Sequence, residues 1–109
     1  MLEVRYYLAS NGSSPFADWF AEVDAAARAK ITVAIARMGQ GNLSNVKSVG
    51  GGVLEYKIDF GPGYRVYFGR DGDVLVVLLT GGTKKRQQRD IKSAIAFWTD
   101  YKAIKRGRR

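Results

Sequence analysis

Two segments of the chain carry the side chains whose types and spacing could do chemistry. Lys57 lies in an alternating segment before the turn 61–63, and Arg65 and Tyr67 lie in the alternating segment that follows it. Because residues two apart in a strand point to the same side, the alternation predicts a hairpin with all three side chains on one face. Lysine and arginine can bind a phosphate together, and the Tyr67 ring is predicted to stack on a base.

The pairing within this hairpin is predicted from its turn. If a three-residue turn at 61–63 closes the hairpin, Asp59 lies opposite Arg65 and Lys57 lies opposite Tyr67. A second interpretation of the same face is a solvated sheet surface with an Asp59–Arg65 ion pair, since such pairs are common and only weakly stabilising. The residues of the hairpin alone leave both interpretations open.

A second cationic segment precedes the last amphipathic stretch of the chain. Lys84, Lys85 and Arg86 stand where a helix is expected to begin, and positive charge at that end opposes the helix dipole. An anionic ligand would explain them, because exposed amides and cationic side chains can together surround a phosphate. The alternative is that each side chain extends into water. Arg86, Arg89 and Lys47 are predicted to contact RNA.

The absence of histidine and cysteine narrows the chemistry. It excludes an imidazole base, a thiol nucleophile, a disulfide and the metal sites built on these residues. Cleavage of RNA by its own 2′-hydroxyl group fits what is left, because the substrate supplies the nucleophile and the protein orients it and neutralises charge. Arg65 would bind the non-bridging oxygens, and Lys57 would stabilise charge or assist deprotonation. Lys84 or Lys85 would serve the leaving oxygen.

The carboxylates give little support to a metal-dependent reaction. Asp71 and Asp73 flank Gly72, and this pattern is typical of a tight hairpin turn. Two local carboxylates are also few for a hard cation, which takes six or more oxygen ligands. We therefore predict no metal and no cofactor.

The positive charge of the chain is confined to one end. The net charge is +8, yet residues 1–83 hold eight basic and eight acidic residues, whereas residues 84–109 hold ten basic and two acidic ones. Such a segment attracts a polyanion, such as a nucleic acid, an acidic protein or a membrane surface. A solubilising tail is the alternative on composition alone.

The length and apolar content predict a single folded domain that stays in the cytosol. The 109 residues suit one core, and 46% hydrophobic residues are enough to form it. The longest apolar run, Val74–Leu79, is far shorter than the roughly 20 residues that cross a bilayer. The first residues include Glu3 and Arg5 and lack the apolar stretch of a signal peptide.

The hydrophobic periodicity predicts an α+β fold with an antiparallel sheet of three or four strands. Ser14 and Asp24 are predicted to cap two helices, the second ending at Gly39, and Thr83 to cap a last helix. Residues 39–52 are predicted to be a long loop, and the tail 105–109 to be flexible. The predicted strands are 2–8, 53–60, 64–70 and 73–80.

The segments 53–72, 76–85 and 88–96 resemble the RelE/ParE toxin superfamily, and more narrowly its HigB-type, phage Gp49-like "addiction module killer" branch. The most specific parts are Gly-Tyr-Arg-Val-Tyr-Phe at 63–68 and Gly-Gly-Thr-Lys-Lys at 81–85. The resemblance covers nearly the whole chain. It implies a RelE-like order of an N-terminal strand, a helical hairpin, a three-strand antiparallel meander and a C-terminal helix.

The resemblance also implies a function. RelE and HigB members are toxins of type II toxin–antitoxin modules that cut mRNA on the translating ribosome without a metal. A cognate helix-turn-helix antitoxin silences them. The family's basic positions fall on Lys57, Arg65 and Lys84 or Lys85, whereas Asp59 stands where RelE has a second strand lysine, and RelE's tyrosine near the start of the last helix has no counterpart here.

Two alternatives to the ribonuclease remain. The ParE branch shares the fold and inhibits DNA gyrase, and fold alone does not separate the two activities. A basic module that binds nucleic acid without catalysis also agrees with the composition.

Overall fold

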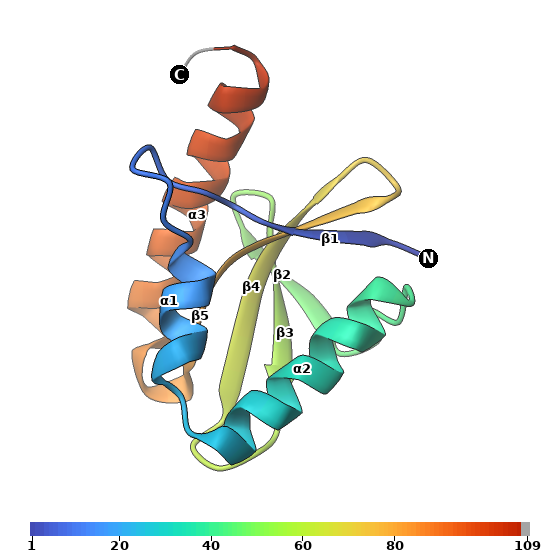
Figure 1. Cartoon of the computed structure of the whole chain (residues 1–109), viewed down its shortest axis with the longest axis vertical. Helices are drawn as coiled ribbons and strands as arrows, with labels where there is room; N and C mark the ends of the chain where they lie inside the picture. The colour runs from blue at the N-terminus through green and yellow to red at the C-terminus, as the bar shows by residue number, and fades with distance from the viewer. Residues whose placement is uncertain (108–109) are drawn as a thin grey trace.

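The computed structural model describes residues 1–107, which form a five-stranded mixed sheet with helices on both faces (Figure 1). The strand order is β1-β5-β4-β3-β2. The elements in chain order are β1 (Glu3–Tyr6), α1 (Pro15–Glu22), α2 (Ala25–Gly39), β2 (Val46–Gly50), β3 (Val53–Ile58), β4 (Tyr64–Asp71), β5 (Leu75–Thr83), a 3-10 turn η1 (Lys84–Arg86) and α3 (Gln87–Lys105).

The alternation of side chains along the strands divides the core into two parts. On one face of the sheet, residues such as Val66 and Leu78 pack against Phe16 of α1 and Ile31 of α2. On the other face, residues such as Val77 pack against α3. The predicted α+β class and the β3-β4-β5 meander are confirmed.

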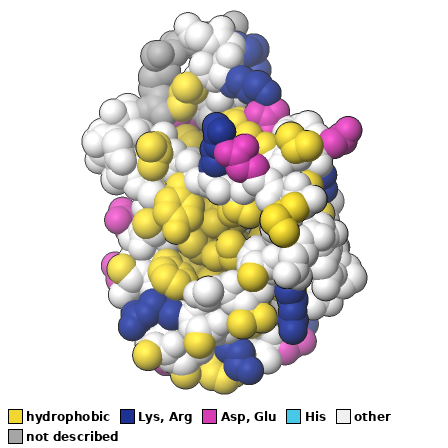
Figure 2. Space-filling model, turned by 45° about the vertical axis from the view of Figure 1, so that its right-hand side comes forward, with side chains coloured by type: hydrophobic (Ala, Val, Ile, Leu, Met, Phe, Trp, Pro, Cys, Tyr) yellow, Lys and Arg dark blue, Asp and Glu magenta, His cyan; other side chains and the backbone are white. Residues whose placement is uncertain are grey.

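The first face is not fully covered by helices. Figure 2 shows a hollow lined with hydrophobic side chains, with charged side chains above and below it. None of the helices in residues 1–107 is long and apolar enough to cross a membrane.

The first two helices, α1 and α2, begin as their local sequences predict. The Ser14 side chain accepts a hydrogen bond from the Ala17 amide at 3.0 Å, and Asp24 accepts one from the Ala27 amide at 2.8 Å. These bonds satisfy amides that lack a partner within the helix. The end of α2 differs from the prediction, because Gly39 is still helical and Gly41 takes the left-handed conformation with φ of +83°.

The sheet is larger than predicted, and it is not purely antiparallel. Part of the predicted loop 39–52 forms β2, an edge strand that pairs antiparallel with β3. At the other edge β1 runs parallel to β5. The last strand also begins and ends later than predicted, at Leu75–Thr83.

The β3-β4 hairpin has a longer turn than predicted. Ile58 pairs with Tyr64, which leaves residues 59–63 in the turn. A shift of two residues keeps every side chain on its face but changes its partner. Lys57 therefore lies opposite Arg65, not opposite Tyr67, and the predicted Asp59–Arg65 pair does not form.

The last helix extends further than predicted. Lys105, the first residue of the predicted flexible tail, belongs to α3, and its ammonium group pairs with the Asp71 carboxylate on β4. Arg108 and Arg109, the last residues of that predicted tail, lie outside the described residues.

Candidate functional site

Two rows of side chains cross the sheet on the face that α3 covers. The first row consists of Lys47, Glu55, Tyr67 and Thr80, which are register partners on β2, β3, β4 and β5. Paired residues project to the same side of a sheet. Lys47 is exposed at the edge, whereas Glu55 is 1% exposed and Tyr67 is fully buried. The row therefore runs from solvent into the core.

The second row lies closer to the hairpin turn and consists of Lys57, Arg65 and Gly82. A Cβ atom at Gly82 would lie only 1.9 Å from a carboxylate oxygen of Asp90. The Asp90 side chain from α3 therefore occupies the place where β5 would otherwise present its own side chain. Only glycine at position 82 leaves room for this approach.

Glu55 connects three elements through its buried carboxylate. Its Oε2 accepts a hydrogen bond from Nε2 of Gln87 at 2.8 Å. Its Oε1 lies 3.7 Å from Nε of Arg65 and 3.8 Å from Nζ of Lys47. Glu55 therefore holds the start of α3 against β2 and β4, and its charge compensates the buried guanidinium.

Several polar atoms around Glu55 are buried without a hydrogen bond. They are Oε1 of Glu55, Nε and Nη1 of Arg65 and the hydroxyl of Tyr67. Burial, followed by the negative charge of Glu55, raises the pKa of Tyr67 well above its usual range. Tyr67 is therefore a neutral phenol beside Glu55 at pH 7.

Lys84 lies beside this second row. Its backbone amide donates a hydrogen bond to the Gly63 carbonyl at 2.9 Å. Gly63 has φ of +80°, and a Cβ atom there would lie 3.3 Å from Nη1 of Arg65 and 3.6 Å from Cβ of Lys84. The turn thus brings Lys57, Arg65 and Lys84 to one end of the sheet, and we call these three residues the basic cluster.

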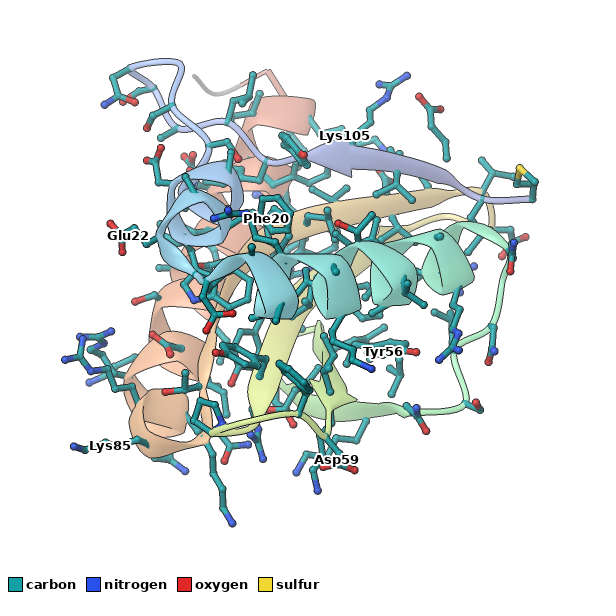
Figure 3. All side chains as sticks on the ribbon, turned by 60° about the horizontal axis from the view of Figure 1, so that its bottom comes forward. Phe20, Glu22, Tyr56, Asp59, Lys85 and Lys105 are labelled. Carbon is teal, nitrogen blue, oxygen red and sulfur yellow. The ribbon has the colours of Figure 1, made fainter. Side chains whose placement is uncertain are left out.

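The remaining cations at the start of α3 are Lys85, Arg86 and Arg89, which line one pocket of about 560 Å³ together with Lys84. Lys85 extends outward from the molecule, away from the hairpin turn marked by Asp59 (Figure 3). Arg86 and Arg89 also line a second cavity of about 280 Å³ together with Trp19 and Asp90. Burial raises the pKa of Asp90, and the neighbouring Arg89 and Arg86 charges oppose this shift.

Three predicted details are corrected by the structure. The Tyr67 ring is fully buried, so it offers no surface on which a base could stack. Arg65 is only 5% exposed, so most of its guanidinium lies beneath the surface. Thr83 precedes the turn η1 and makes no capping hydrogen bond through its side chain. The Lys57 side chain is half-exposed and pairs with Asp59 at 3.5 Å, and Lys84 is exposed.

Sequence reasoning missed the acidic side of the site. Glu55, Gln87 and Asp90 are not among the predicted site residues. One feature of the sequence could have predicted that Glu55 is buried. The strand after Asp73 is apolar on both faces, so both faces of the sheet must be covered. Among residues 1–107, no group of three or more His, Cys, Asp or Glu side chains is arranged to hold a metal ion.

Comparison with known proteins defines the family. Residues 18–97 match the family model described as phage-derived protein Gp49-like (DUF891). An uncharacterized protein of Haemophilus influenzae (strain Rd) is 45% identical over 80 residues, which cover 72% of this chain and 81% of that protein. The chain therefore belongs to the Gp49-like family of phage-derived proteins.

Proposed function

We propose that this protein is the toxin of a toxin–antitoxin module and that it cuts mRNA on the translating ribosome. The observation that carries the proposal is the basic cluster, because Lys57, Arg65 and Lys84 come from three segments and meet at one end of the sheet. Membership of the Gp49-like family, which is often associated with toxin–antitoxin modules, supports the class of protein.

The reaction is a transfer within the RNA. The 2′-oxygen attacks the adjacent phosphorus, the bond from phosphorus to the 5′-oxygen breaks, and the 2′-proton leaves with solvent or the leaving oxygen. The products are a 2′,3′-cyclic phosphate and a 5′-hydroxyl group. The protein must therefore align the attacking oxygen and neutralise the charge on phosphorus.

The three cations divide this work according to their exposure. Lys57 and Lys84 reach solvent and would contact the phosphate oxygens directly. Arg65 lies beneath them, and Glu55 and the sheet hold in place its guanidinium charge, which Glu55 partly compensates. A preorganised charge of this kind stabilises the transition state without having to move during the reaction.

Dependence on the ribosome follows from what the chain does not supply. The chain contains no histidine to take the proton of the 2′-hydroxyl. Alignment of the attacking oxygen must then provide a larger share of the rate, and mRNA held in the ribosome is already ordered. We propose the ribosome and mRNA as targets in the cytoplasm.

The same charge distribution suggests the inhibitor. A helix-turn-helix antitoxin with an Asp- and Glu-rich segment would pair with the +8 segment 84–109 and cover the basic cluster. Such an association should be fast and should slow as salt is added.

Primer extension on translated mRNA tests the proposal. The wild-type protein should cut mRNA on ribosomes and leave the same RNA intact in solution. Lys57→Ala and Lys84→Ala should each lower the cleavage rate by about 10²-fold, because each removes a cation from the phosphate. Lys102→Ala, which removes an exposed charge far along α3, is the matched control and should cut normally.

Two outcomes would contradict this function. Intact mRNA together with gyrase-linked DNA breaks would identify a gyrase inhibitor instead. Full cleavage by the Lys57→Ala, Lys84→Ala double variant would remove the basic cluster from the active site.

A further inference from the structure

Lys57 also lines a pocket between α2 and β3, on the side of β3 that faces away from α3. Its volume is about 380 Å³, which is the size of typical small-molecule sites. Its wall includes Lys30, Val33, Arg37, Asn45, Tyr56 and Phe60. In Figure 3, Tyr56 and Asp59 lie below α2 at this side of the molecule. We call this cavity the α2–β3 pocket.

Two cations in the pocket have no acidic partner. Lys30 and Arg37 are seven residues apart on α2, a spacing that places them on one side of the helix. Both are exposed, and neither forms an ion pair with any residue in 1–107. Asp59 is the one carboxylate on the pocket wall, and it pairs with Lys57 at 3.5 Å. The pocket therefore carries a net positive charge that an anion could neutralise.

The same pocket also presents apolar and aromatic surface. Val33 is 48% exposed, which is unusual for a large aliphatic side chain. The Lys30 ammonium lies 5.4 Å from the centre of the Phe60 ring, and Phe60 is only half-buried. An anion that also carries a flat apolar group would use both kinds of surface at once.

A nucleotide has this combination in one unit, whereas an acidic peptide would need an aromatic or aliphatic residue placed beside its carboxylates. The base can stack on Phe60 and pack on Val33, while its phosphates approach Lys30 and Arg37. The Asn45 side chain can both donate to and accept from the edge of a base. Aspartate and glutamate side chains would neutralise the charge but would leave the ring and Val33 in contact with water.

The pocket and the basic cluster share one residue, Lys57. Lys57 lines the pocket and is also the register partner of Arg65. We propose that the α2–β3 pocket binds one nucleotide of single-stranded RNA next to the cleaved phosphate. The inference rests on the proposed function, and it adds a binding site on the opposite side of β3 from α3.

Equilibrium binding separates this inference from catalysis. The probe is a fluorescein-labelled RNA hexamer with 2′-O-methyl groups, which has no free nucleophile and is not cut. Fluorescence anisotropy gives its Kd at several salt concentrations. The Lys30→Ala, Arg37→Ala double variant should bind about tenfold more weakly and should lower the salt slope by about 1.4, because each lost phosphate contact contributes about 0.7 on single strands.

A second variant tests the aromatic surface without changing charge. Phe60→Leu keeps an apolar side chain but removes the ring, and it should weaken binding by about fivefold or more with an unchanged salt slope. The Lys102→Ala, Arg106→Ala double variant is the matched control, since it removes two exposed charges at the far end of α3. It should bind within about twofold of wild type.

The outcomes separate the pocket from the proposed activity. A wild-type protein that cuts no RNA but loses hexamer binding in the Lys30→Ala, Arg37→Ala variant would refute the activity and support the pocket. A wild-type protein that cuts RNA, with pocket variants that bind no worse than the control variant, would overturn the pocket. Tighter binding of a glutamate-rich peptide than of the hexamer, lost in the same variants, would also overturn it.

Discussion

The two ends of α3 pack against the sheet in different ways. At the C-terminal end Trp98 is 6% exposed and stacks on Tyr101, with ring centres 5.1 Å apart. The Tyr101 hydroxyl donates a hydrogen bond to Asp71 at 2.7 Å. At the N-terminal end α3 covers Glu55 and Arg65, whose facing atoms lack close hydrogen bonds. One end is apolar with satisfied polar groups, and the other is ionic and incompletely satisfied.

The difference shows that the apolar end of α3 stabilises the fold and that the ionic end carries a cost in stability. A buried polar atom without a hydrogen bond lowers the free energy of unfolding by about 1–3 kcal/mol. Packing along the rest of the helix must offset this cost. Tight packing at Trp98 can offset it, since a Cβ atom at Gly69 would lie 2.4 Å from that ring. Buried charge with unsatisfied hydrogen bonds is typical of functional sites.

The largest effect on stability is expected at the apolar end. Trp98→Ala should lower the free energy of unfolding by about 3–5 kcal/mol, because it empties a large volume between Gly69 and Tyr101. Urea denaturation measures this change, and Trp98→Phe should lose clearly less. A loss below about 1 kcal/mol would show that α3 is not anchored at this end.

A smaller loss of stability is expected when the Glu55 carboxylate is removed at the N-terminal end of α3. Glu55→Ala should lower the free energy of unfolding by about 2–3 kcal/mol, since it leaves Arg65 buried without a counter-charge and Gln87 without its acceptor. Glu55→Gln keeps the acceptor and removes only the charge. If both variants were as stable as wild type, Glu55 would not hold the start of α3.

The hydrogen bond between Tyr101 and Asp71 should contribute about 1 kcal/mol to the free energy of unfolding. Tyr101→Phe removes the hydrogen bond to Asp71, and urea denaturation at neutral pH should show that loss. Hydrogen bonds from Lys105 and then Tyr101 hold the pKa of Asp71 below its usual range. The contribution of Asp71 is therefore complete above the unfolded pKa of about 4 and is lost as the pH falls through the lower folded value.

The pH dependence of stability tests whether the Asp71 carboxylate holds the C-terminal end of α3. Wild type should lose more stability than Asp71→Asn as the pH is lowered through the acid range. Parallel curves for the two proteins would show that the Asp71 carboxylate does not stabilise the fold.

The smallest effect, with the opposite sign, is expected at Asp90. Burial raises the folded pKa of Asp90, so the folded state holds its proton more tightly than the unfolded state. This group therefore adds stability as the pH falls through its raised folded value, and it costs stability above that value. Asp90→Asn should raise the free energy of unfolding at pH 7 by a few tenths of a kcal/mol. A destabilised Asn variant would mean that Arg86 and Arg89 outweigh the burial.

Several features of the fold could be predicted because their causes are local. The caps at Ser14 and Asp24 use amides three residues away, so the local sequence contains both partners. The meander follows from alternation and from the glycine-containing turns after Phe60 and Arg70. The cationic residues Lys57, Arg65 and Lys84 could be singled out for the same reason, since residue type and spacing are visible in the sequence.

Other features depend on partners that are distant in the sequence. β2 is a short edge strand with few apolar residues, and it is ordered by pairing with β3. β1 pairs in parallel with β5, which lies about 70 residues later in the chain. The alternating pattern of β1 does not show whether it pairs parallel or antiparallel. The end of α2 also has a distant partner, because the Gly39 carbonyl accepts a hydrogen bond from the Leu2 amide at 2.6 Å.

What the sequence by itself determined is the three helices, four of the five strands, their order and the end of the chain that carries the positive charge. What only the tertiary structure decided is which charges are buried and which face one another. The five-residue turn 59–63 shifted the hairpin by two residues and placed Lys57 opposite Arg65. The packing of α3 then enclosed Glu55, because a sheet whose central strand is apolar on both faces must be covered on both.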